Sequence, residues 1–190
     1  YREALESFLS PADLDLLADK DLEFLMSIAP GFLPGALGPL AAFPVYSLEK
    51  HLTGAVHSRW TQKIGFTPLV RGNRDVREVA ELVDIILGAS CVPPVLPSRG
   101  VSGMPVLDGG LIDSVPASLA EGRAGKTLVL LSKRYRKPLP VVKDRVYVQP
   151  SEPIRIDKFD YANPAGLQQA YDLGVGDGNR FAAEECYRAH

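Results

Sequence analysis

Residues 105–116 read PVLDGGLIDSVP, and this stretch decides how the rest of the chain is interpreted. An apolar run ends at Asp108, two glycines follow at once, and Pro116 closes the segment. We therefore predict a buried strand with a carboxylate at its carboxyl end, which is where open α/β sheets bind their ligands. Gly109 and Gly110 would let the backbone approach another segment closely or adopt a positive φ.

Two interpretations of Asp108 follow from this position. Asp-Gly is a common turn pair, in which the carboxylate only accepts hydrogen bonds from nearby backbone N–H groups. A carboxylate held at the end of a buried strand can instead take a proton from a serine hydroxyl within reach and act as its general base. We favour the role of general base over that of a turn cap, because Asp108 directly follows an apolar run.

The composition is that of a globular protein with a substantial core. The chain has 190 residues, of which 46% are hydrophobic and 23% charged, and we expect one domain. The formal net charge of -2 argues against a nucleic-acid-binding protein. Cys91 and Cys186 are too few for a disulfide framework, which favours a reducing compartment and a cytoplasmic or membrane-peripheral protein.

An uncharged segment runs from Phe24 to Leu48 and is long enough to cross a bilayer. Its repeated prolines and glycines would break a spanning helix, so a transmembrane segment is not expected. An apolar, irregular loop or lid fits better and would suit a lipid-like ligand or peripheral membrane contact. A loop that simply packs on the core is an equally good interpretation.

Hydrophobic periodicity predicts helices in the first part of the chain and a strand–helix–strand rhythm later. Ser10 and Pro11 are typical of a helix start. The predicted helices cover residues 11–28, 47–60, 75–89, 117–124 and 164–173, with a last one from about residue 179. The predicted strands are 106–107, 127–132 and 145–149. The rhythm indicates a parallel sheet in an α/β layer architecture.

Other motifs offer little chemistry. Residues 120–127 look like a phosphate-binding loop, but they lead into a strand instead of following one. Residues 174–178 indicate a turn between two helices. Ser90 lies in part of a nucleophile elbow, yet Val92 stands where the closing glycine belongs. The three histidines, His51, His57 and His190, have neither the spacing of a metal site nor an obvious acidic partner. Cys186 is by default interpreted as a core thiol.

Two blocks of the sequence resemble the second half of patatin-like phospholipases. Residues 86–97, ILGASCVPPVLP, followed by residues 106–116, VLDGGLIDSVP, are similar to that family's helix ending in Ala-Ser-x-x-x-Pro, its Asp-Gly-Gly motif and the proline after it. Residues 146–178 resemble the bacterial C-terminal pattern. The resemblance spans about residues 71–178, and residues 1–67 match loosely, as a helical cap-like region would.

The resemblance implies a three-layer α/β fold with a mostly parallel central sheet, in which residues 68–190 hold the Asp-Gly-Gly part of the core. It also implies an acyl-ester hydrolase that acts on phospholipids, lysophospholipids or carboxylesters through a Ser–Asp dyad without histidine, cofactor or metal. Asp108 would be the carboxylate of this dyad, with Gly109 and Gly110 supporting it. Asp113 and Ser114 depart from the asparagine that commonly precedes the family's proline.

The family's nucleophile lies in a Gly-x-Ser-x-Gly elbow, and its oxyanion hole in a glycine-rich loop, both before Asp-Gly-Gly. Neither motif occurs in these 190 residues. We therefore expect this chain to be the C-terminal part of such an enzyme, inactive alone, with the serine on a missing N-terminal segment or a partner chain. The oligomeric state stays open. One alternative is a non-catalytic module that binds lipid or protein; another is an α/β domain of a different enzyme class with Asp108 only in a turn.

Overall fold

The computed structural model describes residues 2–32, 44–45, 48–49, 60–92, 99–157, 160 and 162–184. The chain divides into two units, Tyr1–Pro116 and Ala117–His190, and each unit holds one sheet. The predicted division into a cap-like region, residues 1–67, and a core part, residues 68–190, stays a prediction. Strand β1 (Glu23–Ile28) lies in the first range and pairs with a strand of the second.

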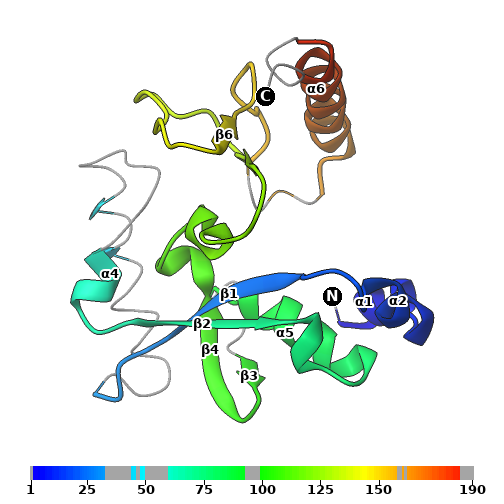
Figure 1. Ribbon diagram of the computed structural model, residues 1–190, viewed down its shortest axis with the longest axis vertical. Coiled ribbons are helices and arrows are strands. Elements are labelled where there is room, and N and C mark those ends of the chain that lie inside the picture. The colour runs from blue at the N-terminus through cyan, green and yellow to red at the C-terminus, as the bar shows by residue number, and fades with distance from the viewer. Residues whose placement is uncertain are drawn as a thin grey trace. The chain divides into compact units, whose positions relative to one another are not determined.

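The first unit is built around a four-stranded antiparallel sheet with the order β2-β1-β4-β3 (Figure 1). β1 pairs with β2 along its whole length, but with β4 only through Met26↔Asp108 and Ser27↔Leu107. Helix α5 contacts all four strands. The other elements of this unit are α1 (Arg2–Phe8), α2 (Pro11–Leu17), α4 (Trp60–Lys63), β2 (Thr67–Gly72), a 3-10 turn (Asn73–Asp75), α5 (Val79–Ala89), β3 (Arg99–Val101), β4 (Met104–Asp108) and a second 3-10 turn (Gly109–Leu111).

The start of α2 confirms the predicted helix start. Ser10 is its N-cap and Pro11 its first residue. The Asp13 carboxylate accepts hydrogen bonds from the Ser10 backbone N–H (2.7 Å) and the Ser10 hydroxyl (2.6 Å). These contacts lower the pKa of Asp13 below its ordinary value, and the hydroxyl has the larger effect.

The predicted helix over residues 11–28 is wrong in its second half, since α2 ends at Leu17 and β1 begins at Glu23. Leucines at helical spacing suit a helix locally, but Phe24 and Ile28 also favour strands. Pairing with β2, more than 35 positions later, decides the conformation of residues 23–28. Tertiary pairing therefore overrides the local periodicity.

The first unit does not contain the predicted mostly parallel central sheet, because all the strand pairs of its sheet are antiparallel. The prediction rested on apolar runs such as Val106-Leu107. Both residues are buried, and they pack into different clusters on opposite faces of β4. A strand covered on both faces reads as a continuous apolar run in either orientation, so the sequence pattern does not reveal the strand direction.

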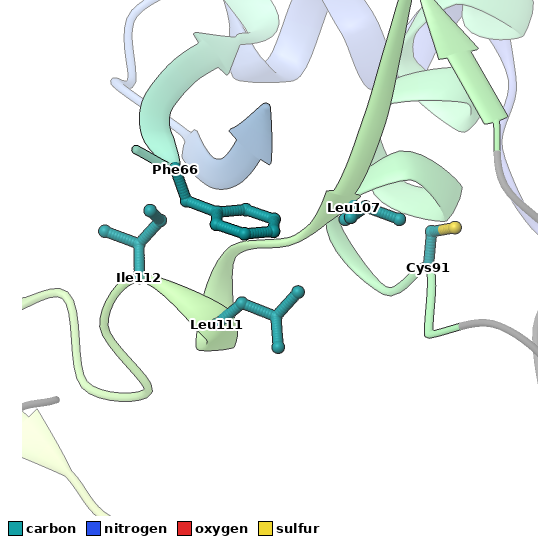
Figure 2. Close-up of a cluster of buried hydrophobic side chains, with 5 residues drawn as sticks. All are labelled: Phe66, Cys91, Leu107, Leu111 and Ile112. Carbon is teal, nitrogen blue, oxygen red and sulfur yellow. The ribbon is translucent and has the colours of Figure 1, made fainter. Parts of the chain in front are cut away.

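Among the described residues, one buried cluster lies on each face of β4. The first contains Met26, Ile85, Val101 and Val106, which join β1, α5, β3 and β4. Figure 2 shows the second, in which the ring of Phe66 points toward Leu107. The members of the second cluster are Phe66, Cys91, Leu107, Leu111 and Ile112.

The second unit contains a 3-10 turn (Ala117–Ala120), strands β5 (Thr127–Leu130) and β6 (Arg145–Val148), and helix α6 (Pro164–Ala183). β5 and β6 pair in parallel, which confirms both predicted strands. The predicted helix over residues 117–124 is only the short 3-10 turn, and β5 does not share a sheet with β4, so the strand–helix–strand unit behind the parallel prediction is not present. The predicted turn at residues 174–178 is wrong, because α6 runs through it as one helix. Gly174, Gly176 and Gly178 have open space around them, and the helix includes them in spite of their low helix propensity.

Other predicted elements have mixed outcomes. The helix predicted over residues 75–89 is confirmed from Val79 to Ala89. The helix predicted over residues 47–60 lies largely outside the described residues, as does much of the apolar segment from Phe24 to Leu48. Within the part of the chain that the structure describes, no helix has the length and apolar character needed to cross a membrane.

Candidate active site

Asp108 is the last residue of β4, and the 3-10 turn Gly109–Leu111 begins immediately after it. Its Oδ1 accepts a hydrogen bond from the backbone N–H of Gly110 at 2.6 Å. The side chain therefore caps the turn, as the simpler interpretation expected. Capping also fixes the orientation of the carboxylate, and a carboxylate has lone pairs for several hydrogen bonds, so this contact is compatible with a further role.

The backbone of Asp108 is held by two other segments. Its N–H donates to the carbonyl of Cys91, just beyond α5, at 2.8 Å. Its carbonyl accepts a hydrogen bond from the Ser27 hydroxyl on β1 at 3.0 Å. The side chain of Ser27 is completely buried, so this bond is not exchanged with water. Asp108 is thus tied to the segment after α5, to β1 and to its own turn.

Ser27 is the residue of this site that sequence reasoning missed. It is 81 positions from Asp108, and it lies inside an apolar run that suggested only a helix or a loop. A serine in an apolar strand indicates a buried hydroxyl that needs a partner. That signal does not name the partner.

Gly109 is required by close packing. A Cβ at this position would lie 2.1 Å from the carbonyl oxygen of Leu25, and one at Gly110 would lie 2.9 Å from Oδ1 of Asp108. Neither glycine has a φ in the left-handed region. Of the two predicted uses of these glycines, the structure shows close approach and not positive φ.

The chain after Asp108 is well anchored. The carbonyl of Gly109 accepts hydrogen bonds from the N–H groups of Ile112 (2.9 Å) and Asp113 (3.0 Å). The buried hydroxyl of Thr61 donates to the carbonyl of Leu111. Oδ1 of Asp113 accepts from the N–H two residues later at 2.9 Å, the same local motif as at Asp108. Asp113 is therefore a matched comparison for Asp108, because it shares the turn geometry but does not end a strand.

The other residues considered from the sequence do not join this site within the described structure. Ser90 is exposed at the end of α5, where its hydroxyl donates to the carbonyl of Ile86 at 3.1 Å. Among the described residues, no group of three or more His, Cys, Asp or Glu side chains is arranged to hold a metal ion. The remaining candidates lie outside the described residues: His51, His57, Cys186 and His190.

Comparisons with known proteins identify the family. The family model described as patatin-like phospholipase matches residues 2–121. Comparison with curated proteins and with solved structures found no match. The family match covers residues 2–67, for which the motifs gave only a loose resemblance, and ends before residues 146–178. Because it spans more than half of the 190 residues and includes Asp108 with both glycines, the chain belongs to the patatin-like phospholipase family, a family of lipid acyl hydrolases.

Proposed function

We propose that the complete protein is a serine acyl hydrolase of phospholipids or lysophospholipids, and that Asp108 is the carboxylate of its Ser–Asp dyad. The serine and the oxyanion hole would lie outside these 190 residues, on a preceding segment or a partner chain, since the sequence contains no Gly-x-Ser-x-Gly. The observation that carries the proposal is Asp108 itself, fixed at the end of β4 within the residues that the family model matches.

In the proposed reaction, the Asp108 carboxylate takes the proton of the serine hydroxyl as its oxygen attacks the ester carbonyl. The protonated Asp108 then returns this proton to the leaving alcohol when the C–O bond of the ester breaks, which leaves an acyl-enzyme. A water molecule attacks the acyl-enzyme in the same way, with Asp108 first accepting and then returning a proton. The products are a fatty acid and an alcohol, and no cofactor is needed.

The anchoring of Asp108 suits this role. A general base must keep its acceptor oxygen in place while a proton moves, because small displacements reduce the rate strongly. Asp108 has its carboxylate oriented by Gly110 and its backbone held by Ser27 and Cys91. These contacts support a positioned base.

The test is Asp108→Asn in the complete protein, with hydrolysis of lysophosphatidylcholine and of a short-chain ester as readouts. Asparagine keeps the size and can still accept from Gly110, but it cannot take a proton. We expect kcat to fall by about 10²–10⁴-fold, the usual contribution of a positioned base. Asp113→Asn is the matched control and should stay within about threefold of the parent, since that carboxylate caps a turn in the same way but does not follow a strand.

Turnover of Asp108→Asn within about tenfold of the parent, a loss below about 1.4 kcal/mol, would remove Asp108 from the mechanism. Labelling with a fluorophosphonate probe tests the serine separately. The complete protein should be labelled and the 190-residue chain should not. A complete protein that neither reacts with the probe nor hydrolyses either ester would instead support the non-catalytic module.

A further inference from the structure

A short stretch after β5 concentrates positive charge. Residues 133–137 read KRYRK, so four of the chain's 21 Lys and Arg residues lie within five positions. No acidic residue occurs in the sequence between Glu121 and Asp144, although the chain as a whole has a formal net charge of -2. We call residues 133–137 the basic segment. Its four cationic residues are all exposed, and they are Lys133, Arg134, Arg136 and Lys137.

The basic segment is anchored to the chain just beyond β6. The backbone N–H of Tyr135 donates to Oε1 of Gln149, the residue directly after β6, at 2.9 Å. The guanidinium of Arg134 donates to the carbonyl of Ser151. Since β5 and β6 are parallel, the segment lies at the carboxyl ends of both strands. These contacts hold the four cations together at one end of the sheet.

The basic segment carries charges of one sign only. Like charges at this spacing repel each other, and salt screens the repulsion of near neighbours only in part. A surface that serves only solubility mixes charges of both signs. A block of one sign is typical of a surface that interacts with a partner of opposite charge. We therefore expect an anionic partner at this end of the sheet.

Tyr135 indicates the class of this partner. The residue is half-buried, and Nζ of Lys133 lies 5.1 Å from the centre of its ring. Tyrosine beside Lys and Arg is typical of the boundary between water and lipid, where the ring lies among the headgroups and the cations are attracted to anionic lipids. Stacking on nucleic-acid bases depends instead on open ring faces, and Lys133 lies over one face of this ring. The segment therefore fits a lipid surface better than a nucleic acid.

We propose that the basic segment docks the complete protein on membranes that contain anionic phospholipids. This inference rests on the proposed function, which gives the enzyme a phospholipid or lysophospholipid substrate, and it adds the surface by which the protein reaches that substrate. Clusters of about four to eight Lys and Arg residues bind anionic membrane surfaces, and the segment supplies four. The attraction extends over about one Debye length, roughly 10 Å at 0.1 M salt, and needs no pocket.

The test is sedimentation of the complete protein with vesicles of ether-linked phosphatidylcholine, with and without ether-linked phosphatidylglycerol. Ether lipids have no acyl ester, so binding is measured without turnover. We expect binding at least about tenfold tighter to the vesicles that contain phosphatidylglycerol, because the cations add their attraction only there. High salt should remove this difference.

Two variants of the basic segment separate charge from shape. Lys133→Gln/Arg136→Gln removes two cations and keeps the anchoring contacts of Arg134 and Tyr135. Its binding to the anionic vesicles should be about 25-fold weaker, since each cation near the surface contributes about fivefold. Lys133→Arg/Arg136→Lys should bind like the parent, because a fluid lipid surface is recognised by charge, whereas a fixed bidentate site distinguishes Arg from Lys.

Lys20→Gln/Lys63→Gln is the matched control. It removes two exposed cations of the first unit, so the net charge of the protein changes by the same amount as in the segment variant. Binding of this control to the anionic vesicles should stay within about twofold of the parent, because charges more than a Debye length from the membrane are screened.

Equal binding of the parent to the two kinds of vesicle would overturn the proposal. Equal binding of the segment variant and the control would also overturn it, since the segment would then have no special part. If the parent bound a single-stranded oligonucleotide through the segment but did not bind the anionic vesicles, the partner would be a nucleic acid instead. Hydrolysis of a soluble short-chain ester is measured separately. Failure of the dyad would leave vesicle binding unchanged, and failure of the docking surface would leave hydrolysis of this ester dependent on Asp108.

Discussion

The two sheets of this protein differ in how their apolar side chains are covered. In the antiparallel sheet, Met26 and Val106 are fully buried, and α5 and the chain around Phe66 supply the covering layers. In the parallel sheet, Val129 is buried while Leu130 is largely exposed. Around β4 the first sheet is thus covered on both faces, whereas in the second sheet the described residues of its own unit leave apolar side chains exposed. Asp108 belongs to the covered sheet, and its position is fixed by contacts within the first unit.

The largest effect should come from placing a methyl group where the first sheet has no space. Gly109→Ala puts a Cβ 2.1 Å from the Leu25 carbonyl oxygen, so β1 and the turn must separate. We expect roughly 4 kcal/mol of lost stability, the range of severe backbone and packing conflicts. Urea unfolding followed by the fluorescence of Trp60, the only tryptophan, reports on this unit.

Gly174→Ala in α6 is the matched control, because a Cβ there meets nothing within 4 Å. Alanine in an exposed helix should stabilise α6 by about 1 kcal/mol, seen as a higher midpoint of helix loss by circular dichroism. The two glycine substitutions should therefore act in opposite directions. If Gly109→Ala left the stability unchanged, the turn would not pack closely against β1.

The second prediction compares one buried and one exposed apolar residue. Met26→Ala leaves a cavity between β1 and α5 and should cost about 3 kcal/mol in urea unfolding. Leu130→Ala, at an exposed position of β5, should change the stability of the 190-residue chain by less than about 0.5 kcal/mol. A cost of more than about 1.5 kcal/mol for Leu130→Ala would show that this side chain is buried in solution.

The smallest predicted effect is a pH dependence at α6. Hydrogen bonds from Ser151, with a further contribution from Arg180, lower the pKa of Asp177 below its ordinary value of 3.8. A lowered pKa means that the contact stabilises the fold above the ordinary value and is lost as the pH falls through the folded-state value. The amide resonance of Ser151 should therefore shift with a midpoint below pH 3.8, and Asp177→Asn should remove this step.

A midpoint for Ser151 above pH 3.8 would contradict the direction of the shift. Asp13 offers a comparison in the first unit, because hydrogen bonds from Ser10 lower its pKa in the same way. Protonation of Asp13 should loosen only the first turn of α2. Protonation of Asp177 should release the contact between α6 and residue 151.

Local features of the sequence predicted the strand that ends at Asp108, because a short apolar run followed by Asp-Gly-Gly is typical of a strand that ends in a turn. They also predicted β5 and β6 as strands, but not that these two strands pair with each other. What they did not predict depends on partners far along the chain. Residues 23–28 form a strand because of β2, and the direction of β4 depends on β1, so neither could be read from a local pattern.

The same distinction holds for the candidate site. The carboxylate and its glycines were visible in the sequence, since each has a local signature. The support from Ser27 was not visible, because a single serine carries no information about a carbonyl 81 positions away. Two reasons were predicted for Gly109 and Gly110, a close approach of the backbone and a positive φ. The structure shows the close approach but not the positive φ.

The hydrogen bond from Ser27 to the carbonyl of Asp108 also has a kinetic consequence. It joins residues 81 positions apart, and contacts of such high sequence separation form slowly because a long loop must close first. During synthesis, residues 23–28 emerge early and remain without their β4 partner until Asp108 has been made. The candidate carboxylate therefore reaches its final position only late in folding, after an exposed apolar strand edge has persisted for most of the synthesis of this unit.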